Sequence, residues 1–310
     1  MTARGAAALA AAAVGAAACA LRGGAPYRPW LRLGLDRLVV AYEDPRPADK
    51  RLLFERINRD RLRHGVPAVS WEPRAALVGD LFCLDAALTG SAGHWDMQGR
   101  APYLRWGLAG GVAYHAQNAA AWSLASGRFD GPVGEMLIQS HESMMAETPP
   151  HDGHRRLLLD PAYTHVGIGL AVVGRQFRLS EEFTRVAFEW IAVPSQPLRA
   201  GSLATMAGRP LPGWQVGLVE VRFEPPPKPL SLLEIEARSS YGYPPTVRTM
   251  YPEAGRDGLE VRHRGEVRLR FVLDQGPGHY FVLCYVRRAG DGPKLLTMMP
   301  ATAAMVTATP

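Results

Sequence analysis

The sequence predicts an α/β domain followed by an all-β sandwich domain. Three observations predict this order: helical patterns up to about residue 147, then an apolar hairpin, then strand-length apolar segments separated by turn signals. The chain has 310 residues, which suits two domains of ordinary size. We expect a leader at residues 1–22, the α/β domain at 23–193 and the β-sandwich at 194–310.

The N-terminal segment predicts a secretory signal peptide. One early charge, Arg4, precedes an alanine-rich apolar run that ends near Ala20. A bilayer span needs about 20 strongly apolar residues, so neither this run nor any later segment predicts an integral membrane span. Cys19 follows small residues as in a bacterial lipobox, although Ala16 stands where leucine is usual. We expect a secreted or periplasmic protein, with a lipid anchor at Cys19 to the cell envelope as the alternative.

The composition indicates a globular protein without a nucleic-acid partner. Hydrophobic residues make up 47% of the chain and charged residues 21%, as in folded domains. The formal net charge is +6, but the arginines that supply it are scattered, and no basic run is interleaved with aromatic residues. The expected partner is an unknown ligand or a cell-surface molecule.

Two cysteines, Cys83 and Cys284, remain after the leader. Export to an oxidising compartment would permit a disulfide between them. Each stands in an apolar context, which favours two buried free thiols instead. No Cys-x-x-Cys pair predicts a zinc site of the cysteine type.

Two helices are predicted at the start of the first domain. Pro47 suits the first turn of one helix, and Gly65 suits the position just beyond its end. Pro73 and Gly90 bound the second helix in the same way. Four leucines at i, i+4, i+7 and i+11 give this second helix one apolar stripe: Leu77, Leu81, Leu84 and Leu88.

A third helix is predicted at residues 133–147. Pro149-Pro150 ends it, because proline cannot continue the hydrogen-bond ladder and restrains the residue before it. The preceding segment, residues 91–131, is predicted to be rich in loops. A short helical turn at 155–159 leads into the hairpin.

The hairpin consists of strands at 164–173 and 175–190, with Gly174-Arg175 as its turn. From residue 194 onward, apolar segments of strand length alternate with proline- and glycine-rich turns, which predicts a β-sandwich. The expected strands of this domain are 216–223, 259–263, 267–273 and 280–286.

Three polar residues in the first domain predict a site. His94 and His154 are imidazoles in loop contexts, and Glu147 is a carboxylate at a helix end. Two imidazoles and a carboxylate brought together from distant loops form a metal or acid/base site. Other interpretations stay open: His94 caps backbone groups, and Glu147 is solvated or pairs with an arginine.

Residues 50–190 resemble the CAP superfamily of cysteine-rich secretory, antigen 5 and pathogenesis-related proteins, and the likeness is greatest to its bacterial, cysteine-poor members. The motifs that carry the resemblance are Asn58 to Arg61, Gly65 to Trp71, His94 with Asp96 and Gly99, Ala116-Gln117-Asn118-Ala119, Met144 to Glu147, Gly153-His154-Arg155, and Val166-Gly167-Ile168-Gly169. The resemblance implies an α-β-α sandwich for this domain.

The resemblance also implies a cleft lined by two histidines and two glutamates. By position these are His94, Glu147 and His154, with Gln117 in place of one glutamate and Asn118 beside it. Because an amide cannot act as a carboxylate, we expect a weaker cation site. A divalent metal such as zinc would be held by His94, His154 and Glu147.

Several neighbouring residues allow other assignments. Gln117 and Asn118 can simply tie loop backbone together, and Glu142 stands in for the missing carboxylate if the register differs by about a turn and a half. Three histidines near these motifs are expected at the surface or behind the ligands: His141, His151 and His165. His115 precedes the Gln117 motif, and a place at the border of the cleft stays open for it. A Ser-His-Glu grouping of Ser140 or Ser143 has little support, since adjacent helical residues do not face each other.

The predicted function is that of a secreted binding or interaction module. Its cleft would hold a divalent cation or a small polar ligand, and the resemblance adds lipids or sterols as ligands. The alternative is a metal-assisted hydrolase of peptide or ester bonds. In that enzyme, His94 and His154 would hold the ion, and the catalytic residues would be Glu147 and His154.

Overall fold

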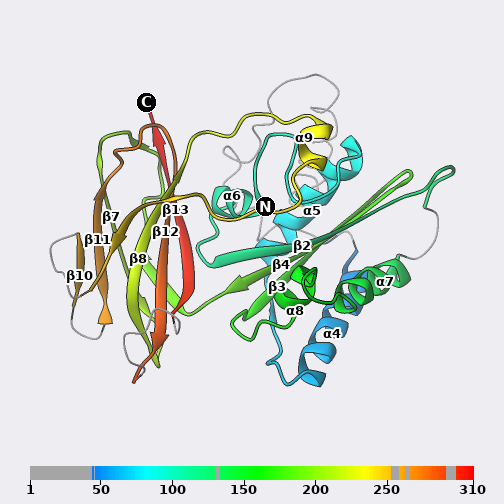
Figure 1. Ribbon diagram of the computed structural model, residues 1–310, viewed down its shortest axis with the longest axis horizontal. Coiled ribbons are helices and arrows are strands. Elements are labelled where there is room, and N and C mark those ends of the chain that lie inside the picture. The colour runs from blue at the N-terminus through cyan, green and yellow to red at the C-terminus, as the bar shows by residue number, and fades with distance from the viewer. Residues whose placement is uncertain (1–43, 45, 130–132, 253–257, 263–264, 291–297) are drawn as a thin grey trace, which may run out of the picture.

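The computed structural model describes residues 44, 46–129, 133–252, 258–262, 265–290 and 298–310. The expected signal segment and Cys19 lie outside these residues. The described chain forms a helix-covered sheet and a β-sandwich that lie side by side (Figure 1). Within the described ranges, no helix combines the length and apolar character needed to cross a membrane.

The helices of the first region are α4 (Pro47–Arg63), α5 (Pro73–Thr89), α6 (Pro102–Leu108), α7 (Gly134–Met145) and α8 (Gly153–Leu158). Helices α4 and α5 begin at the predicted prolines. Gly65 and Gly90 lie just beyond their ends with φ angles of 72° and 80°. Only glycine adopts positive φ at little cost, which explains why both helices stop there.

The sheet of this region has the strand order β1-β3-β4-β2. Its strands are β1 (Ser70–Trp71), β2 (Tyr114–Ser123), β3 (His165–Val173) and β4 (Gln176–Arg185). Helix α5 covers one face. Helices α4 and α7 cover the other face, where Leu53 and Leu137 pack with Ile168 and Phe183. This arrangement is the expected α-β-α sandwich.

The buried face of α5 is not the predicted leucine stripe. Leu77 is buried, but Leu88 is 39% exposed, and most residues against the sheet are small. Gly79 lies so close to β3 that a Cβ added there would be 2.8 Å from Cα of Gly169. The glycines of β3 therefore allow close helix–sheet packing, which leucine spacing alone does not reveal.

Strand β2 corrects the expectation that residues 91–131 are loop-rich. This segment contains α6 and the ten-residue strand β2, whose sequence is rich in alanine and lacks β-branched residues. Such a sequence carries no strand signal. The strand forms because β4 pairs with it along its whole length. Since β4 is its single neighbour in the sheet order, β2 is an edge strand.

The predicted hairpin is present, but its second strand is shorter than expected. β4 ends at Arg185, and Phe188–Ala192 form a separate strand, β5. β5 pairs antiparallel with β7 of the sandwich. The pairing of the second region therefore begins ahead of residue 194.

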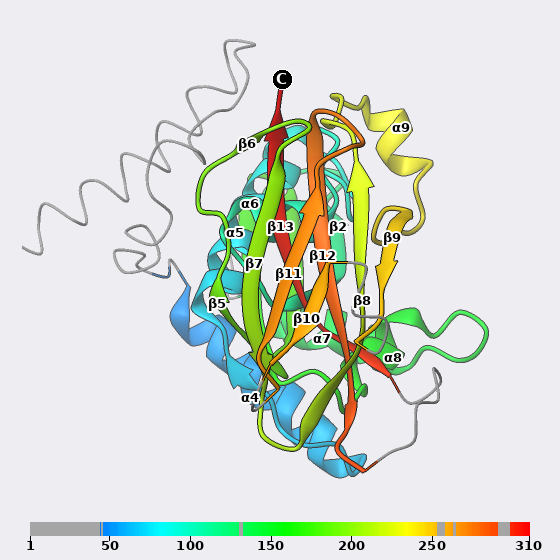
Figure 2. The ribbon, with the colours of Figure 1, turned by 90° about the vertical axis from the view of Figure 1, so that its left-hand side faces the viewer.

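Two sheets make up the sandwich, onto which Figure 2 looks. One sheet has the order β10 (Leu259–Val261), β11 (Val267–Val272), β7 (Leu203–Pro210), β5. The other has the order β6 (Leu198–Arg199), β13 (Met299–Thr309), β12 (Gly278–Arg288), β8 (Trp214–Glu224), β9 (Thr246–Met250). Met206 and Phe271 of the first sheet share a core with Val219 and Val282 of the second.

Strand β12 is buried on both faces. Val282 belongs to the sandwich core, whereas Phe281 and Leu283 pack with Tyr103 and Leu104 of α6 in the first region. A strand covered on both sides has a continuous apolar sequence. This explains the unbroken apolar run that predicted the strand, and it joins the two regions through a shared apolar interface.

Both cysteines are buried free thiols, as their apolar contexts predicted. Cys83 lies on the buried face of α5 and packs against Ala171 of β3, and Cys284 lies in the sandwich core. Burial raises the pKa of both thiols, so they stay protonated and act as small apolar side chains.

Two polar residues of α4 fix the chain that leads into the sheet. Asn58 exchanges two hydrogen bonds with the backbone of Val69, at 2.7 and 3.0 Å. The buried Arg61 guanidinium donates to the carbonyl oxygens of Leu158 (2.6 Å) and Tyr163 (3.1 Å). These residues of the first motif are therefore structural, and they hold the end of α8 in place.

Candidate functional site

The predicted cleft residues meet at the edge strand β2. His94 lies in the loop between α5 and α6, and His154 is the second residue of α8. Gln117 and Asn118 are neighbours on β2, so their side chains point to opposite faces of the sheet. Gln117 bonds to His94, and Asn118 bonds to the carbonyl oxygen of His154. The two imidazoles therefore approach from opposite faces, with ring centroids 6.4 Å apart.

Gln117 fixes the orientation of His94. The Oε1 atom of Gln117 is 2.9 Å from Nδ1 of His94. An amide oxygen only accepts hydrogen bonds, so Nδ1 of His94 carries the proton and Nε2 carries the free lone pair. The positions of the oxygen and nitrogen atoms of the Gln117 amide follow from its second contact, in which Nε2 donates to a carboxylate.

That carboxylate is Glu182 of β4, which is fully buried. Its Oε1 accepts from Nε2 of Gln117 at 2.7 Å, and its Oε2 is 2.9 Å from Nε2 of His115, although that contact lacks hydrogen-bond alignment. Burial would raise the pKa of Glu182, but His115, Arg105 and Gln117 outweigh it and lower the pKa. The negative charge of Glu182 therefore lies next to the amide of Gln117.

Glu147 holds His154 rather than facing the space between the rings. Its Oε1 is 2.5 Å from Nδ1 of His154, and its Oε2 accepts from the backbone N–H of the same residue at 2.9 Å. The carboxylate therefore places the proton on Nδ1 and leaves Nε2 of His154 with the lone pair. The side chain of His154 is 34% exposed, so this nitrogen can be reached from solvent.

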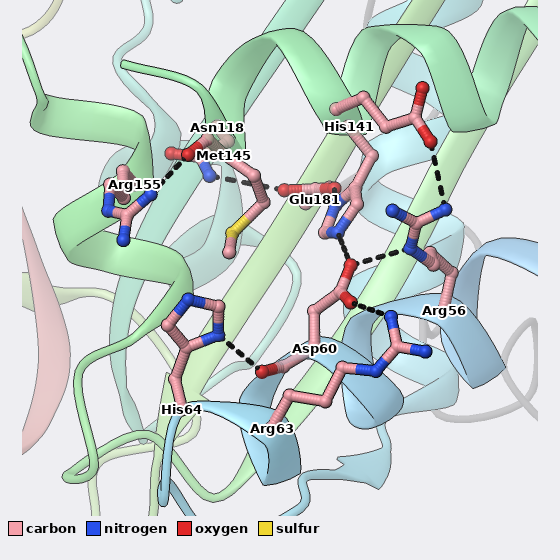
Figure 3. Close-up of polar contacts among 10 residues, drawn as sticks. Arg56, Asp60, Arg63, His64, Asn118, His141, Met145, Arg155 and Glu181 are labelled. Carbon is pink, nitrogen blue, oxygen red and sulfur yellow. Dashed lines mark hydrogen bonds and ion pairs between the residues drawn. The ribbon is translucent and has the colours of Figure 1, made fainter. Parts of the chain in front are cut away.

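A second buried polar network supports the His154 side (Figure 3). Nδ2 of Asn118 donates to Glu181 at 3.1 Å, and the other Glu181 oxygen is 3.2 Å from Nδ1 of His141. Nε2 of His141 is 3.2 Å from Asp60. Burial would lower the pKa of His141, but the two carboxylates outweigh it and raise the pKa. His141 thus ties α4, α7 and β4 together beneath the site through its two ring nitrogens.

Burial has the opposite outcome at His94. It lowers the pKa of His94, and the nearby His154 and Arg105 lower it further, against the hydrogen bond that His94 donates to Gln117, which raises it. His94 is therefore neutral at physiological pH. A neutral imidazole with Nε2 unprotonated is the form that binds a metal ion or accepts a proton from a ligand.

The geometry fits a two-imidazole site rather than the expected three-ligand site. In the described part of the chain, no three His, Cys, Asp or Glu side chains are placed to hold a metal ion. Glu147 is directed to Nδ1 of His154 and to backbone N–H groups, so it supports a ligand rather than acting as one. Tetrahedral zinc would bring the centroids of His94 and His154 to roughly 5 Å, closer than the observed 6.4 Å.

Other polar residues named from the sequence lie away from the two rings. Glu142 is 54% exposed and pairs with Arg56, so it does not replace a site carboxylate. Ser140 and Ser143 donate to backbone carbonyls one helical turn earlier. His151 is exposed, and His165 bonds to the hydroxyl of its neighbour. His115 is buried and stacks on Trp106.

Residues 54–184 match the family model described as the cysteine-rich secretory protein family, CAP. This stretch of the first region is therefore a CAP domain. The matched residues include most of the first helix, nearly all of the sheet and every residue of the site described above. The comparison with curated proteins gives no match.

Three solved structures similar to this chain have low sequence identity to it. An outer surface protein from Borrelia burgdorferi is 11% identical (TM-score 0.36), and the match covers 46% of this chain and 97% of that one. An extracellular protein containing a SCP domain from Bacillus anthracis is 19% identical (TM-score 0.35), and the match covers 52% of this chain and 45% of that one. Na-ASP-1 is 14% identical (TM-score 0.32), and the match covers 44% of this chain and 36% of that one. The chain spans less than half the length of the last two.

Two buried glutamates of this CAP domain are not among the residues that the sequence motifs predict. Glu181 and Glu182 are adjacent on β4, so one lies on each face of the sheet, opposite Asn118 and Gln117. The available signal was a pair of adjacent acidic residues in the middle of a predicted hairpin strand. The site therefore keeps a carboxylate on the His94 side, behind the amide of Gln117.

The second region also contributes to the site of the CAP domain. The ring of Tyr241, from the loop between β8 and β9, lies 4.7 Å from the ring of His94 between centroids. Its hydroxyl bonds to both the backbone N–H and the carbonyl oxygen of Gln117. Sequence reasoning missed Tyr241, because more than a hundred residues separate it from the residues it contacts.

Proposed function

We propose that this protein is a secreted CAP-domain binding module whose site binds a small polar or ionic ligand between His94 and His154. The observation that carries the proposal is the matched fixing of the two imidazoles. Each ring is held at Nδ1 by an acceptor, Gln117 for one and Glu147 for the other. Nε2 of each ring is thereby left as a lone-pair donor, which suits a divalent cation or a ligand that donates a hydrogen bond.

Zinc is the divalent cation that we propose first. His94 and His154 would hold it, with Glu147 and Gln117 as the partners that orient them. A bound ion would supply a positive charge that polarises a ligand oxygen. With two protein ligands and rings 6.4 Å apart, we expect weak and exchangeable binding.

The geometry supports binding better than hydrolysis. A hydrolase would need Glu147 free to take a proton from an attacking water. Both oxygens of Glu147 are instead bonded to His154, through Nδ1 and through the backbone N–H. A role of Glu147 and His154 as catalytic residues therefore gains no support from their positions. We propose the β-sandwich as the part that displays the CAP domain outside the cell.

Isothermal titration calorimetry of the purified full chain with zinc chloride tests the proposal. We expect His94→Ala and His154→Ala each to weaken zinc binding about tenfold or more, and Glu147→Gln to weaken it by about 10–100-fold because His154 loses its orienting partner. His151→Ala is the matched control, since His151 is exposed beside the site. Zinc binding that is equally tight in His154→Ala would contradict the proposal.

A further inference from the structure

The loop between β8 and β9 is much longer than the connection its ends require. Its ends are paired, because Arg222 of β8 lies opposite Thr246 of β9 and Phe223 donates its N–H to the carbonyl oxygen of Pro245. Strands this close can be joined by a few residues. The chain instead makes an excursion over residues 225–245, which includes helix α9 (Leu232–Glu236) and runs from the sandwich to the first region (Figure 1). Long ordered loops of this kind are often functional.

The loop is fixed to the CAP domain at its first and last parts. Leu230 donates its N–H to the carbonyl oxygen of Met97 at 3.0 Å. Trp95, next to His94, donates its indole N–H to Ser240 at 3.3 Å, and the Arg238 guanidinium lies 4.4 Å above the same ring. These contacts hold the loop against the segment that carries His94.

Inward-facing tyrosines then cover the edge strand. Tyr243 stacks on Tyr103 and Tyr114 at 4.6 and 5.1 Å between centroids, and its hydroxyl accepts from the N–H of His115 at 3.3 Å. Tyr241 follows the same pattern two residues along β2, where its hydroxyl both accepts from and donates to the backbone of Gln117. His115 and Gln117 present their backbone groups outward from the sheet edge.

Tyr241 therefore occupies the place of an added strand. The outward N–H and carbonyl oxygen of an edge residue are the groups that an extended ligand would bond by β-strand addition. A phenol hydroxyl matches both because it donates and accepts. Its ring meanwhile lies against His94, while His154 stays 34% exposed.

We propose that Tyr241, supplied by the second domain, determines which ligands the site admits. It closes the His94 side and the edge of β2, so that an extended acyl chain or peptide is excluded. A small polar or ionic ligand enters past His154 and reaches both imidazoles. This inference rests on the proposed function and assigns the ligand class of that site.

The rate of carbethoxylation by diethyl pyrocarbonate measures how far Tyr241 shields His94. Peptide mass mapping follows the reaction of His94 and of His154 separately. In the wild-type chain we expect His94 to react about tenfold more slowly than His154. Tyr241→Ala should raise the His94 rate about tenfold and leave the His154 rate unchanged. Tyr251→Ala is the matched control, because Tyr251 is 46% exposed on the same domain.

The ligand class is tested with dansyl-undecanoic acid as the acyl probe and zinc as the small one. We expect wild-type protein to give no saturable dansyl fluorescence, and Tyr241→Ala to gain it. Equal reactivity of His94 and His154 in the wild-type chain, or saturable binding of the acyl probe by wild type that His154→Ala abolishes, would overturn the inference. If the wild-type protein binds no zinc while its His94 still reacts more slowly than His154 with diethyl pyrocarbonate, the result counts against the proposed function alone.

Discussion

At the level of single residues, Gln117 shows how a substituted motif can keep its electrostatics. The glutamine stands where a carboxylate was expected, and its amide connects His94 to the buried Glu182. An amide is the side chain that can accept from an imidazole N–H on one side and donate to a carboxylate on the other. A second carboxylate at this position would face Glu182 across 2.7 Å.

We therefore expect Gln117→Glu to be destabilising, although it restores the residue that the resemblance implied. Two buried carboxylates in contact repel, and one must bind a proton at a raised pKa. The free energy of unfolding should fall by about 2–4 kcal/mol, because the new buried charge is not compensated. Urea denaturation at pH 7 measures it.

The exchange variant is the control for this prediction. Gln117→Glu combined with Glu182→Gln places the carboxylate next to His94 and the amide behind it, so the pair is again complementary. We expect the double variant to recover most of the stability that the single variant loses, which is a coupling between residues in contact. A double variant as unstable as the sum of both single variants would show that the charge contact is not the cause.

Among the secondary-structure elements, the position of α5 depends on glycine rather than on its leucines. The helix lies so close to β3 that Gly79 and Gly169 are in backbone contact. The close approach places the helix ends, and with them the loop that carries His94. This is a case in which amphipathic spacing identifies a helix but not the side it buries.

Gly79→Ala tests this packing, because the intrinsic preference and the packing have opposite signs. In a solvent-facing helix the change would stabilise by about 1 kcal/mol. Here the new Cβ would lie 2.7 Å from Oγ of Ser180 and 2.8 Å from Cα of Gly169, and we expect a loss of about 2–4 kcal/mol from overpacking. Thermal unfolding measures it. Gly153→Ala is the control, since nothing lies within 4 Å of a Cβ there, and a loss of equal size in it would exclude the packing explanation.

Across the molecule as a whole, the two regions form one structure through α6 and β12. Glu224, the last residue of β8 before the β8–β9 loop, is part of this junction. It accepts a hydrogen bond from the hydroxyl of Tyr103 at 2.8 Å. Burial raises the pKa of Glu224 to about 7, against the hydrogen bond from Tyr103, which lowers it. The junction therefore contains a carboxylate that changes charge near neutral pH.

The sign of the pH effect follows from this raised pKa. Between the ordinary value of 4.5 and about 7, the folded chain binds more protons at Glu224 than the unfolded chain, so the unfolding free energy falls as pH rises through this window. Glu224→Gln should match wild type near pH 4.5 and be more stable by about 2–3 kcal/mol at pH 8. Urea denaturation across this range measures it, and Glu236→Gln, which removes an exposed carboxylate of α9, controls for the loss of a charge. A constant difference between Glu224→Gln and wild type at every pH would contradict the assignment.

Local sequence signals were enough to predict α4, α5, α7 and the short α8 of the CAP domain, its hairpin and several strands of the sandwich, but not α6. Proline and glycine mark those boundaries locally, and apolar periodicity reports burial along one element. The motif residues His94, Glu147 and His154 were also within reach, since each stands in a short recognisable context.

The role of each site residue, by contrast, emerged with the folded arrangement. Edge strand β2 exists through its pairing with β4, Glu182 supplies the charge behind Gln117, and Tyr241 arrives from another domain. These are contacts between segments far apart in the chain, and no local preference of the backbone encodes them. Hydrogen-bond partners and burial arise when the sheets and helices pack, so they are properties of the folded molecule rather than of any stretch of its sequence.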